Sequence, residues 1–270
     1  MTIGFLGAGK MAEALIAAIV DNKLFEPWNV IACDKCAERR RVIEEKYGVA
    51  VTDDAQQTLN SCKVIILAVK PQDLDTLMCA TKNSFRKTHL LISIVAGKTL
   101  ATLQEMTGSK PRVIRVMPNL ALMVQEGMSV TCAAKRAKPA DRQLVQQLFG
   151  SAGAVLELPE RYFDAVTALS GSGPAFVAYL LQALIEGAIA LKLPRDAARF
   201  LAEQTLIGTG IYLQNSNSDI RAFIQAVTSP QGTTAAGMAV LEKATVKKTL
   251  AQTLAAAAAR SRALSASKTR

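Results

Sequence analysis

A pair of glycines between a short apolar run and a helical pattern constrains this chain more than any other feature. Residues 3–6 are largely apolar, and Gly7-Ala8-Gly9-Lys10-Met11-Ala12 follows them directly. In a turn from strand to helix, the first glycine permits the tight bend and the second lets the backbone approach a pyrophosphate. The start of the chain therefore predicts a dinucleotide-binding unit rather than a turn of purely structural role. Its expected cofactor contacts are Gly7, Gly9, Lys10 and Met11.

Short apolar runs alternate with helical patterns over the first half of the chain. The predicted strands cover residues 3–6, 29–33, 63–69, 90–95 and 112–116. Helical patterns cover residues 11–20, 37–47, 73–80 and 100–106. This alternation is typical of a doubly wound parallel sheet, whose buried strands are apolar on both faces. We expect a Rossmann-type α/β domain over residues 1–160.

The second half of the chain has a different pattern, with no predicted strand after residue 160. Helical patterns rich in alanine and leucine cover residues 172–191, 195–213, 220–227 and 233–260. Residues 174–191 are apolar on nearly all sides, and a helix of that kind must be covered all round. Gln182, Glu186 and Gly187 within it favour a buried helix over a membrane span. We expect an all-helical domain over residues 161–270 that forms a homodimer or a larger homo-oligomer.

Charge and cysteine content narrow the functional classes. The net charge is +10, but the cationic residues are not gathered with aromatic ones, so we expect a polyanionic dinucleotide rather than nucleic acid as ligand. The five cysteines and the absence of a basic leader before the first apolar run indicate a cytoplasmic protein. Cys33 and Cys36 form a C-x-x-C without a second pair, and His89 is the only histidine. We therefore expect no metal site.

The end of the second predicted strand is where a dinucleotide fold meets the adenosine ribose. Asp34 suits the free 2′-hydroxyl of NAD, whereas Lys35 and the arginines at positions 39–41 suit the 2′-phosphate of NADP. A solvated helix face is the alternative role for these arginines. The residues alone leave the choice of cofactor open.

A second strand end carries the sequence Ala68-Val69-Lys70-Pro71-Gln72. Ligands of doubly wound sheets lie at the carboxyl ends of the strands. We therefore place Ala68, Val69 and Lys70 near the cofactor, with a surface lysine at a helix start as the alternative for Lys70.

Six sequence blocks resemble, in order, those of the pyrroline-5-carboxylate reductase family. They cover residues 7–12, 68–72, 93–97, 115–119, 168–175 and 227–234. Gly-Ser-Gly-Pro-Ala at 171–175 and Ser-Pro-Gln-Gly-Thr-Thr at 229–234 are the most specific of them. The resemblance spans nearly the full length. It implies a dinucleotide domain, a helical dimerisation domain, and an active site between the nucleotide domain of one subunit and the helical domain of its partner.

The resemblance also implies an activity: an oxidoreductase that transfers hydride from NAD(P)H to 1-pyrroline-5-carboxylate and forms L-proline, the last step of proline biosynthesis. NADP(H) is the expected cofactor, with NAD(H) possible. Asn119 can donate its amide to the nicotinamide region, and a turn asparagine that binds its own backbone is the alternative.

The turn at residues 229–234 precedes a predicted helix and suits the substrate carboxylate, because a helix N-terminus presents free N–H groups. We assign the carboxylate to the backbone of Gly232, Thr233 and Thr234, with help from Ser229. By the resemblance, the Thr234 hydroxyl binds the ring nitrogen, so Thr234 and Ser229 are the expected catalytic residues. An ordinary helix cap is the alternative role for this turn.

Three positions depart from the family pattern. Gln231 stands where the family usually has glycine, which would be strained if that residue has positive φ. Leu120-Ala121 replaces the usual Thr-Pro after Asn119, and Asp53-Asp54-Ala55 stands where relatives often carry an asparagine near the adenosine phosphate. These departures keep two alternatives open: a catalytically weak dinucleotide-binding paralogue, and a related dehydrogenase or imine reductase with another substrate.

Overall fold

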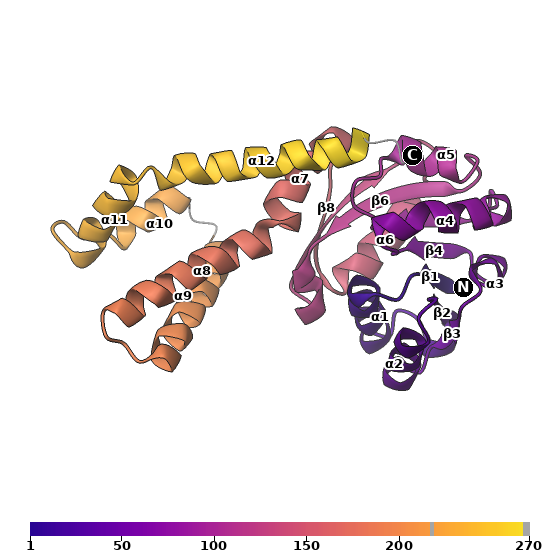
Figure 1. The fold of residues 1–270 in the computed structure, drawn as a ribbon, viewed down its shortest axis with the longest axis horizontal. Helices are drawn as coiled ribbons and strands as arrows, with labels where there is room; N and C mark the ends of the chain where they lie inside the picture. Colours follow the sequence, from indigo (N-terminus) through magenta and orange to yellow (C-terminus); the bar gives the residue numbers. More distant parts are fainter. Residues whose placement is uncertain (217–218, 267–270) are drawn as a thin grey trace. The chain divides into compact units, whose positions relative to one another are not determined.

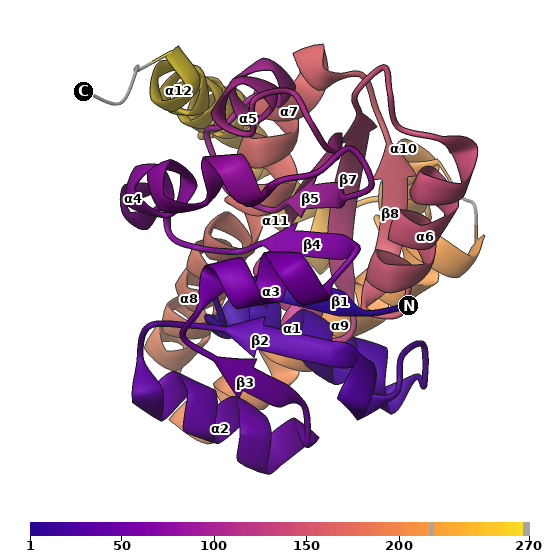
Figure 2. The same cartoon turned by 90° about the vertical axis from the view of Figure 1, so that its right-hand side faces the viewer.

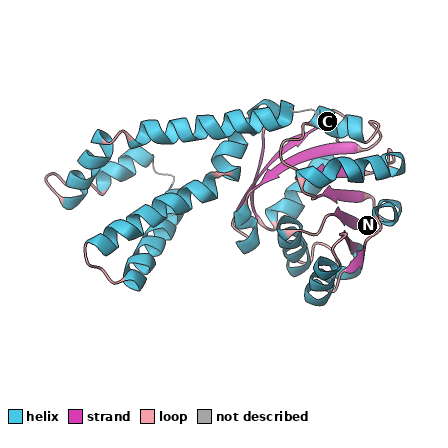
Figure 3. Ribbon diagram, in the orientation of Figure 1, coloured by secondary structure: helices cyan, strands magenta, loops and turns pink. Residues whose placement is uncertain are grey.

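The computed structural model of the chain describes residues 1–216 and 219–266. The chain divides into two compact units, one made of Met1–Ser172 with Ala256–Arg270 and the other of Gly173–Ala255. Within the described residues, every strand belongs to the first unit, whereas the second unit is helical (Figures 1 and 3). The predicted fold class is confirmed: a Rossmann-type sheet is followed by a helical region.

The first unit is built on a sheet of eight strands in the order β3-β2-β1-β4-β5-β6-β7-β8. The strands are β1 (Ile3–Leu6), β2 (Val30–Cys33), β3 (Ala50–Thr52), β4 (Val64–Leu67), β5 (Leu90–Ser93), β6 (Arg112–Pro118), β7 (Gly127–Ala133) and β8 (Gly153–Glu157). The first strand, β1, lies between β2 and β4 and is parallel to both (Figure 2). The strand order reverses at β1, and the ligands of such sheets lie beside this switch point.

The five predicted strands are parallel, as expected, and the one change of direction occurs at β7, a strand that the sequence did not predict. Strand β7 pairs antiparallel with β6, and β8 then runs parallel to β7. The short segment 119–126 between β6 and β7 holds only a 3₁₀ helix, η3 (Leu120–Val124). A parallel crossover needs a dozen or more residues, so a connection of this length reverses the chain.

Helices cover both faces of the sheet, as a doubly wound fold requires. Side chains from α1 (Lys10–Asp21), α2 (Ala37–Tyr47) and α6 (Pro139–Gly150) form one buried cluster with the sheet. Side chains from α3 (Ala55–Ser61), α4 (Pro71–Thr81), α5 (Leu100–Met106) and α7 (Phe163–Val166) form the second. The sheet is therefore a rigid base for the loops at its carboxyl edge.

All five predicted strands are present, and so are the four helices predicted between them. The pattern missed three strands, β3, β7 and β8, and three α-helices of the first unit, α3, α6 and α7. Strand β3 is only three residues long, and none of its residues is buried. Strands β7 and β8 contain small and polar residues or lie half exposed, so an apolar run does not mark them.

Charged side chains join the segment after β8 to the rest of the first unit. The Glu160 carboxylate accepts hydrogen bonds from Arg115 Nη1 at 2.9 Å and from the Leu100 N–H at 2.7 Å. The Arg115 guanidinium also lies 4.5 Å from the centre of the Phe163 ring. Further along the chain, Ser261 Oγ donates to Asp164 Oδ1 at 2.8 Å, which explains why the end of the chain belongs to the first unit.

The second unit consists of α8 (Gly173–Ala190), α9 (Arg195–Ser216), α10 (Ile220–Ala226), α11 (Thr233–Lys243) and the first part of α12 (Val246–Ala266). The sequence predicted one helix over residues 233–260, and the structure corrects this to two helices. Thr245 has φ 53°, which ends α11 without the usual glycine or proline signal. The helix predicted to end at residue 213 continues to Ser216, and the rest of the predicted break falls partly on residues 217–218, outside the described residues.

Helix α8 leaves large apolar side chains uncovered in the single chain. Tyr179 is 72% exposed and Leu184 67% exposed, and no residue of α8 is buried. The segment Glu160–Ala190 is long and apolar enough to cross a membrane, by length and composition alone. One such helix is weak grounds for a membrane span, because a helix in a subunit interface has the same composition.

His89, directly before β5, is 2% exposed, and its Nδ1 accepts a hydrogen bond from the Arg86 N–H at 3.2 Å. Burial lowers the pKa of His89 below its ordinary value of 6.5, and the nearby Arg86 charge lowers it further. The unfolded chain therefore binds a proton at a pH where the folded chain does not. The free energy of unfolding must fall as the pH falls below 6.5.

We expect His89→Asn to flatten this dependence, because an amide can keep the bond from Arg86 and does not titrate in this range. Urea unfolding at several values between about pH 5.5 and 7 measures the slope, whose upper limit is about 1.4 kcal/mol per pH unit for one group. His89 is the only histidine, so wild type should lose more stability toward pH 5.5 than the variant. Equal slopes for both proteins would contradict this account.

Candidate functional site

The loop that joins β1 to α1 is pressed against the end of β4. Gly7 has φ 99°, a conformation that residues with a side chain rarely adopt. A Cβ atom at Gly7 would lie 2.8 Å from the Ala68 carbonyl carbon and oxygen and from the Val69 nitrogen. The Gly7 N–H donates to the Cys33 carbonyl of β2 at 2.8 Å. Gly7, Ala68 and Val69 thus meet at the carboxyl edge of neighbouring strands.

The start of α1 is open on the side where a pyrophosphate is expected. Gly9 is the N-cap of α1, is exposed, and has nothing within 4 Å of the position where a Cβ would stand. Lys10, the first residue of the helix, is exposed, and Met11 is half-buried. A helix N-terminus with free space and no side-chain cap suits a bound phosphate group. The residues present therefore fit the pyrophosphate of a dinucleotide.

Two charged side chains hold the peptide groups on either side of Ala8. Asp34 Oδ2 accepts a hydrogen bond from the Ala8 N–H at 2.8 Å, and Asp34 Oδ1 accepts one from the Cys36 N–H at 2.9 Å. Arg39 donates to the Ala8 carbonyl through Nε at 3.0 Å and Nη2 at 2.7 Å. The sequence did not reveal this role for Arg39, because its partners are backbone atoms that lie far away in the chain.

The arginines after β2 differ in what they contact. Arg40 Nη1 donates to the carbonyls of Asp34 at 2.8 Å and Lys35 at 3.0 Å. Arg41 is exposed and pairs with Glu38 and Glu45 on the surface of α2. Only Arg41 fits the solvated helix face considered from the sequence. The Lys35 side chain is exposed beside them.

Lys70 and Asn119 lie at the ends of two other strands. Lys70 is the exposed N-cap of α4, with Pro71 at the first helical position. Asn119 Oδ1 accepts hydrogen bonds from the Ala121 N–H at 3.2 Å and the Met128 N–H at 3.1 Å. Its Nδ2 is 3.5 Å from Ser170 Oγ, a long contact that leaves the amide able to bind a ligand. Asn119 therefore shapes the turn with its oxygen, and its amide nitrogen stays available at the carboxyl end of β6.

The turn at residues 229–234 belongs to the helical unit. Gly232 is the N-cap of α11, so Thr233 and Thr234 stand at its first two positions. The Gly232 N–H donates to the Ser229 carbonyl at 3.0 Å, and a Cβ at Gly232 would lie 2.3 Å from Ser229 Oγ. Since glycine has no side chain to cap the helix, the first-turn N–H groups remain suited to an anion. Neither Ser229 nor Thr234 acts as an ordinary N-cap.

Gln231 is the departure from the family pattern that the structure marks most clearly. It has φ 58°, in the left-handed region that favours glycine. The turn thus keeps the conformation that a glycine would adopt, and Gln231 bears the strain.

The five cysteines form no disulfide with one another. All five are free, with Cys33, Cys62 and Cys132 buried and Cys36 and Cys79 exposed. Burial raises the pKa of the Cys33 thiol and raises that of Cys62 to about 11. Among residues 1–216 and 219–266, no group of three or more His, Cys, Asp or Glu side chains is arranged to hold a metal ion.

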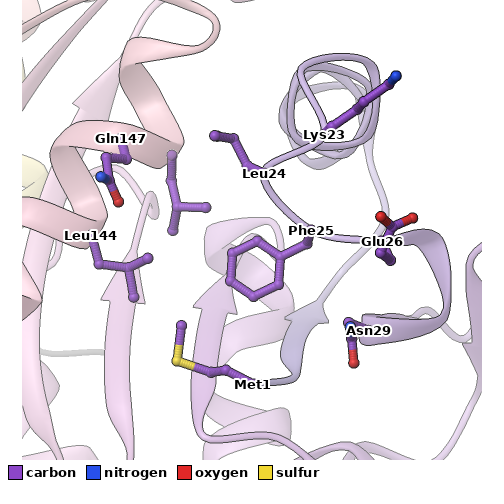
Figure 4. Close-up of a pocket in the computed structure, with 9 residues that line it drawn as sticks. Met1, Lys23, Leu24, Phe25, Glu26, Asn29, Leu144 and Gln147 are labelled. Carbon is purple, nitrogen blue, oxygen red and sulfur yellow. The ribbon is translucent and has the colours of Figure 1, made fainter.

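A pocket of about 460 Å³ lies away from these residues (Figure 4). Lys23, Leu24 and Phe25 from the segment after α1 line it together with Leu144 and Gln147 of α6. It contains none of the predicted site residues. The predicted residues instead form two groups, one at the carboxyl edge of the sheet and one at the start of α11, in separate compact units.

Two family models match the chain. Residues 160–264 match the model for pyrroline-5-carboxylate reductase dimerisation, and residues 2–97 match the model for NADP oxidoreductase, coenzyme F420-dependent. The first match contains helix α8, whose apolar side chains are uncovered in the single chain. A homo-oligomer is thereby supported.

Full-length relatives share this organisation. The chain is 38% identical to pyrroline-5-carboxylate reductase of Arabidopsis thaliana, over 98% of this chain and 96% of that protein. It is 37% identical to the Synechocystis sp. protein of the same name, over 97% of each. The solved structure of a pyrroline-5-carboxylate reductase from Coxiella burnetii matches with a TM-score of 0.92 and 29% identity, over 98% of this chain and 99% of that one. A Plasmodium falciparum pyrroline carboxylate reductase with NADP bound matches with a TM-score of 0.89 and 28% identity, over 98% of each chain.

We expect Gln231→Gly to stabilise the protein by about 0.5–1 kcal/mol, because relief of the positive φ exceeds the entropy cost of glycine in the unfolded chain. Gln231→Ala is the matched control, since alanine shortens the side chain but keeps the strain. Thermal unfolding of the three proteins measures the difference. A midpoint for the glycine variant at or below that of the alanine variant would show that Gln231 is not strained.

Proposed function

The chain belongs to the pyrroline-5-carboxylate reductase family, as its motifs predicted, and we propose that it reduces 1-pyrroline-5-carboxylate to L-proline with NAD(P)H. One observation carries this proposal: sequence and fold agree with that family over nearly the whole chain. The open N-terminus of α1 and the turn at 229–234 then give each reactant a suitable binding group.

The first unit binds the cofactor, which when bound supplies the hydride that reduces the imine carbon. Gly7 and Gly9 let the backbone approach the pyrophosphate, with Lys10 and Met11 beside it at the start of α1. Ala68, Val69 and Lys70 line the neighbouring strand end. Asn119 directs its amide Nδ2 to the nicotinamide region, since its Oδ1 is already bound to the turn.

The helical unit binds the substrate through the start of α11. The N–H groups of Thr233 and Thr234 and the hydroxyl of Ser229 bind the substrate carboxylate. The Gly232 N–H, which the sequence assigned to the same carboxylate, instead donates to the Ser229 carbonyl and closes the turn. The Thr234 hydroxyl hydrogen-bonds the ring nitrogen and orients the ring. The reaction needs close positioning of two carbons and exclusion of water more than a strong general base, so a single buried histidine is no obstacle.

The cofactor preference follows from the surroundings of Lys35. Its exposed ammonium at the end of β2 suits the 2′-phosphate of NADP, which makes NADPH the preferred cofactor and NADH the weaker one. The Plasmodium falciparum structure with NADP bound supports this choice. Asp34 directs one carboxylate oxygen to the Ala8 N–H and the other to the Cys36 N–H.

We also propose that the protein is a homodimer or an assembly of dimers in the cytoplasm. The uncovered apolar side chains of α8 lie within the dimerisation match. The five free cysteines fit a reducing compartment.

Oxidation of NADPH and NADH in the presence of pyrroline-5-carboxylate tests the proposal. We expect Thr234→Val to lower kcat/KM about a hundredfold, because it keeps the side-chain shape but removes the hydroxyl. Thr234→Ser keeps the hydroxyl and should stay within about threefold of wild type.

Equal activity in the valine and serine variants would remove Thr234 from the proposed site. Tight NADPH binding without turnover by wild type would contradict the proposed activity. It would favour the catalytically weak paralogue, and turnover of 3-hydroxyacids or other imines alone would favour a related dehydrogenase or imine reductase.

A further inference from the structure

The Arg39 side chain, which contacts the loop between β1 and α1, is held in place by an ion pair with Glu13. Its Nη2 donates to Glu13 Oε2 at 2.7 Å, and Glu13 is a largely buried residue of α1. Glu13 Oε1 also accepts from Lys46 Nζ at 3.3 Å and from the Tyr47 hydroxyl at 3.2 Å. Burial raises the pKa of Glu13, but the hydrogen bonds from Arg39 and Lys46 outweigh it, so its pKa lies below the usual value. Glu13 is thus an anion that fixes Arg39.

The Arg39 guanidinium meets the loop at a single peptide group. The Ala8 carbonyl accepts two hydrogen bonds from it, and this carbonyl shares its peptide group with the Gly9 N–H. The C=O and N–H of a trans peptide point in opposite directions. Arg39 therefore turns the Gly9 N–H away from itself, and its positive charge polarises the peptide so that this N–H becomes a stronger donor.

Asp34 holds the preceding peptide group from the other side. Its Oδ2 accepts the Ala8 N–H, so this N–H is directed to Asp34 rather than to a phosphate. The backbone of Ala8 is therefore held by an anion at its N–H and by a cation at its carbonyl. Together, Asp34 and Arg39 fix the direction of the Gly9 N–H before any ligand arrives.

We propose that Arg39 and Asp34 are positioning residues that orient the Gly9 N–H toward the cofactor pyrophosphate, and that Arg39 does not bind the 2′-phosphate. The proposal rests on the dinucleotide binding proposed above. It assigns to Arg39 an effect common to NADPH and NADH, since both carry the pyrophosphate. Discrimination between them falls to Lys35, because Arg40 is bound to the carbonyls of Asp34 and Lys35 and lies 3.6 Å from Asp53 Oδ2.

The test is the affinity of the purified full-length protein for NADPH and for NADH, each titrated separately by calorimetry. We expect Arg39→Ala to weaken both by the same factor, about tenfold, the scale of one lost charge-assisted hydrogen bond. Lys35→Ala should weaken NADPH alone. Arg41→Ala is the matched control, because it removes the same charge from the same helix. The Arg41 side chain is exposed and pairs with Glu38 and Glu45 of α2, so this variant should leave both affinities unchanged.

Arg39→Lys separates loss of the loop contact from a folding defect. It keeps a cation beside Glu13 but loses the two-pronged contact with the Ala8 carbonyl. It should weaken both cofactors equally and by less than Arg39→Ala. The KM for the imine at saturating cofactor should not change in either variant, whereas a general loss of structure would alter it.

Two results would overturn the proposal. A loss confined to NADPH in the Arg39 variants would identify Arg39 as a ligand of the 2′-phosphate. Unchanged affinity for both cofactors in these variants would show that the contact with Ala8 does not prepare the loop. Because binding is measured without the imine, a failure of the proposed reductase activity leaves this test intact, and absence of nucleotide binding by wild type would refute the premise itself.

Discussion

The close approach of the Gly7 backbone to the end of β4 is the constraint on which the site depends. Any side chain at Gly7 would enter the Ala68–Val69 peptide group, and φ 99° is itself unfavourable for other residues. This approach brings the start of α1 to the carboxyl edge of the sheet beside the switch in strand order. The charged contacts of Asp34 and Arg39 with Ala8 then fix the loop in one orientation. Backbone sterics place the loop, and electrostatics orient its peptide groups.

The sequence predicted the strands that consist mainly of apolar residues and the helices between them. It did not predict β7 and β8, because burial of these strands depends on neighbours distant in the chain rather than on an apolar run. The reversal of direction at β7 follows from a connection that is too short for a parallel crossover. Because β7 itself was not predicted, the length of this connection could not be known from the sequence. The break at Thr245 has no local signal, since threonine rarely adopts positive φ.

For the site, glycine spacing and strand ends predicted where the important residues lie, but not what their side chains contact. The charge of Asp34 suggested a ribose ligand, and the structure adds that its oxygens accept hydrogen bonds from the N–H groups of Ala8 and Cys36. Arg39 resembled a phosphate ligand or a surface residue, whereas it joins buried Glu13 to the glycine loop. Such networks join residues of different elements, so only the folded chain reveals them. The departure at Gln231 was recognised from the sequence, and its positive φ came from the structure.

The central claim is that this chain catalyses hydride transfer from a dinucleotide to a cyclic imine. The most direct measurement uses NADPH that carries deuterium on one face of nicotinamide C4, with each face labelled in a separate reaction. Mass spectrometry then follows the product formed from pyrroline-5-carboxylate. The account predicts L-proline with one deuterium at the former imine carbon from one labelled form and unlabelled proline from the other. Oxidised cofactor without deuterium in proline from either form would contradict it.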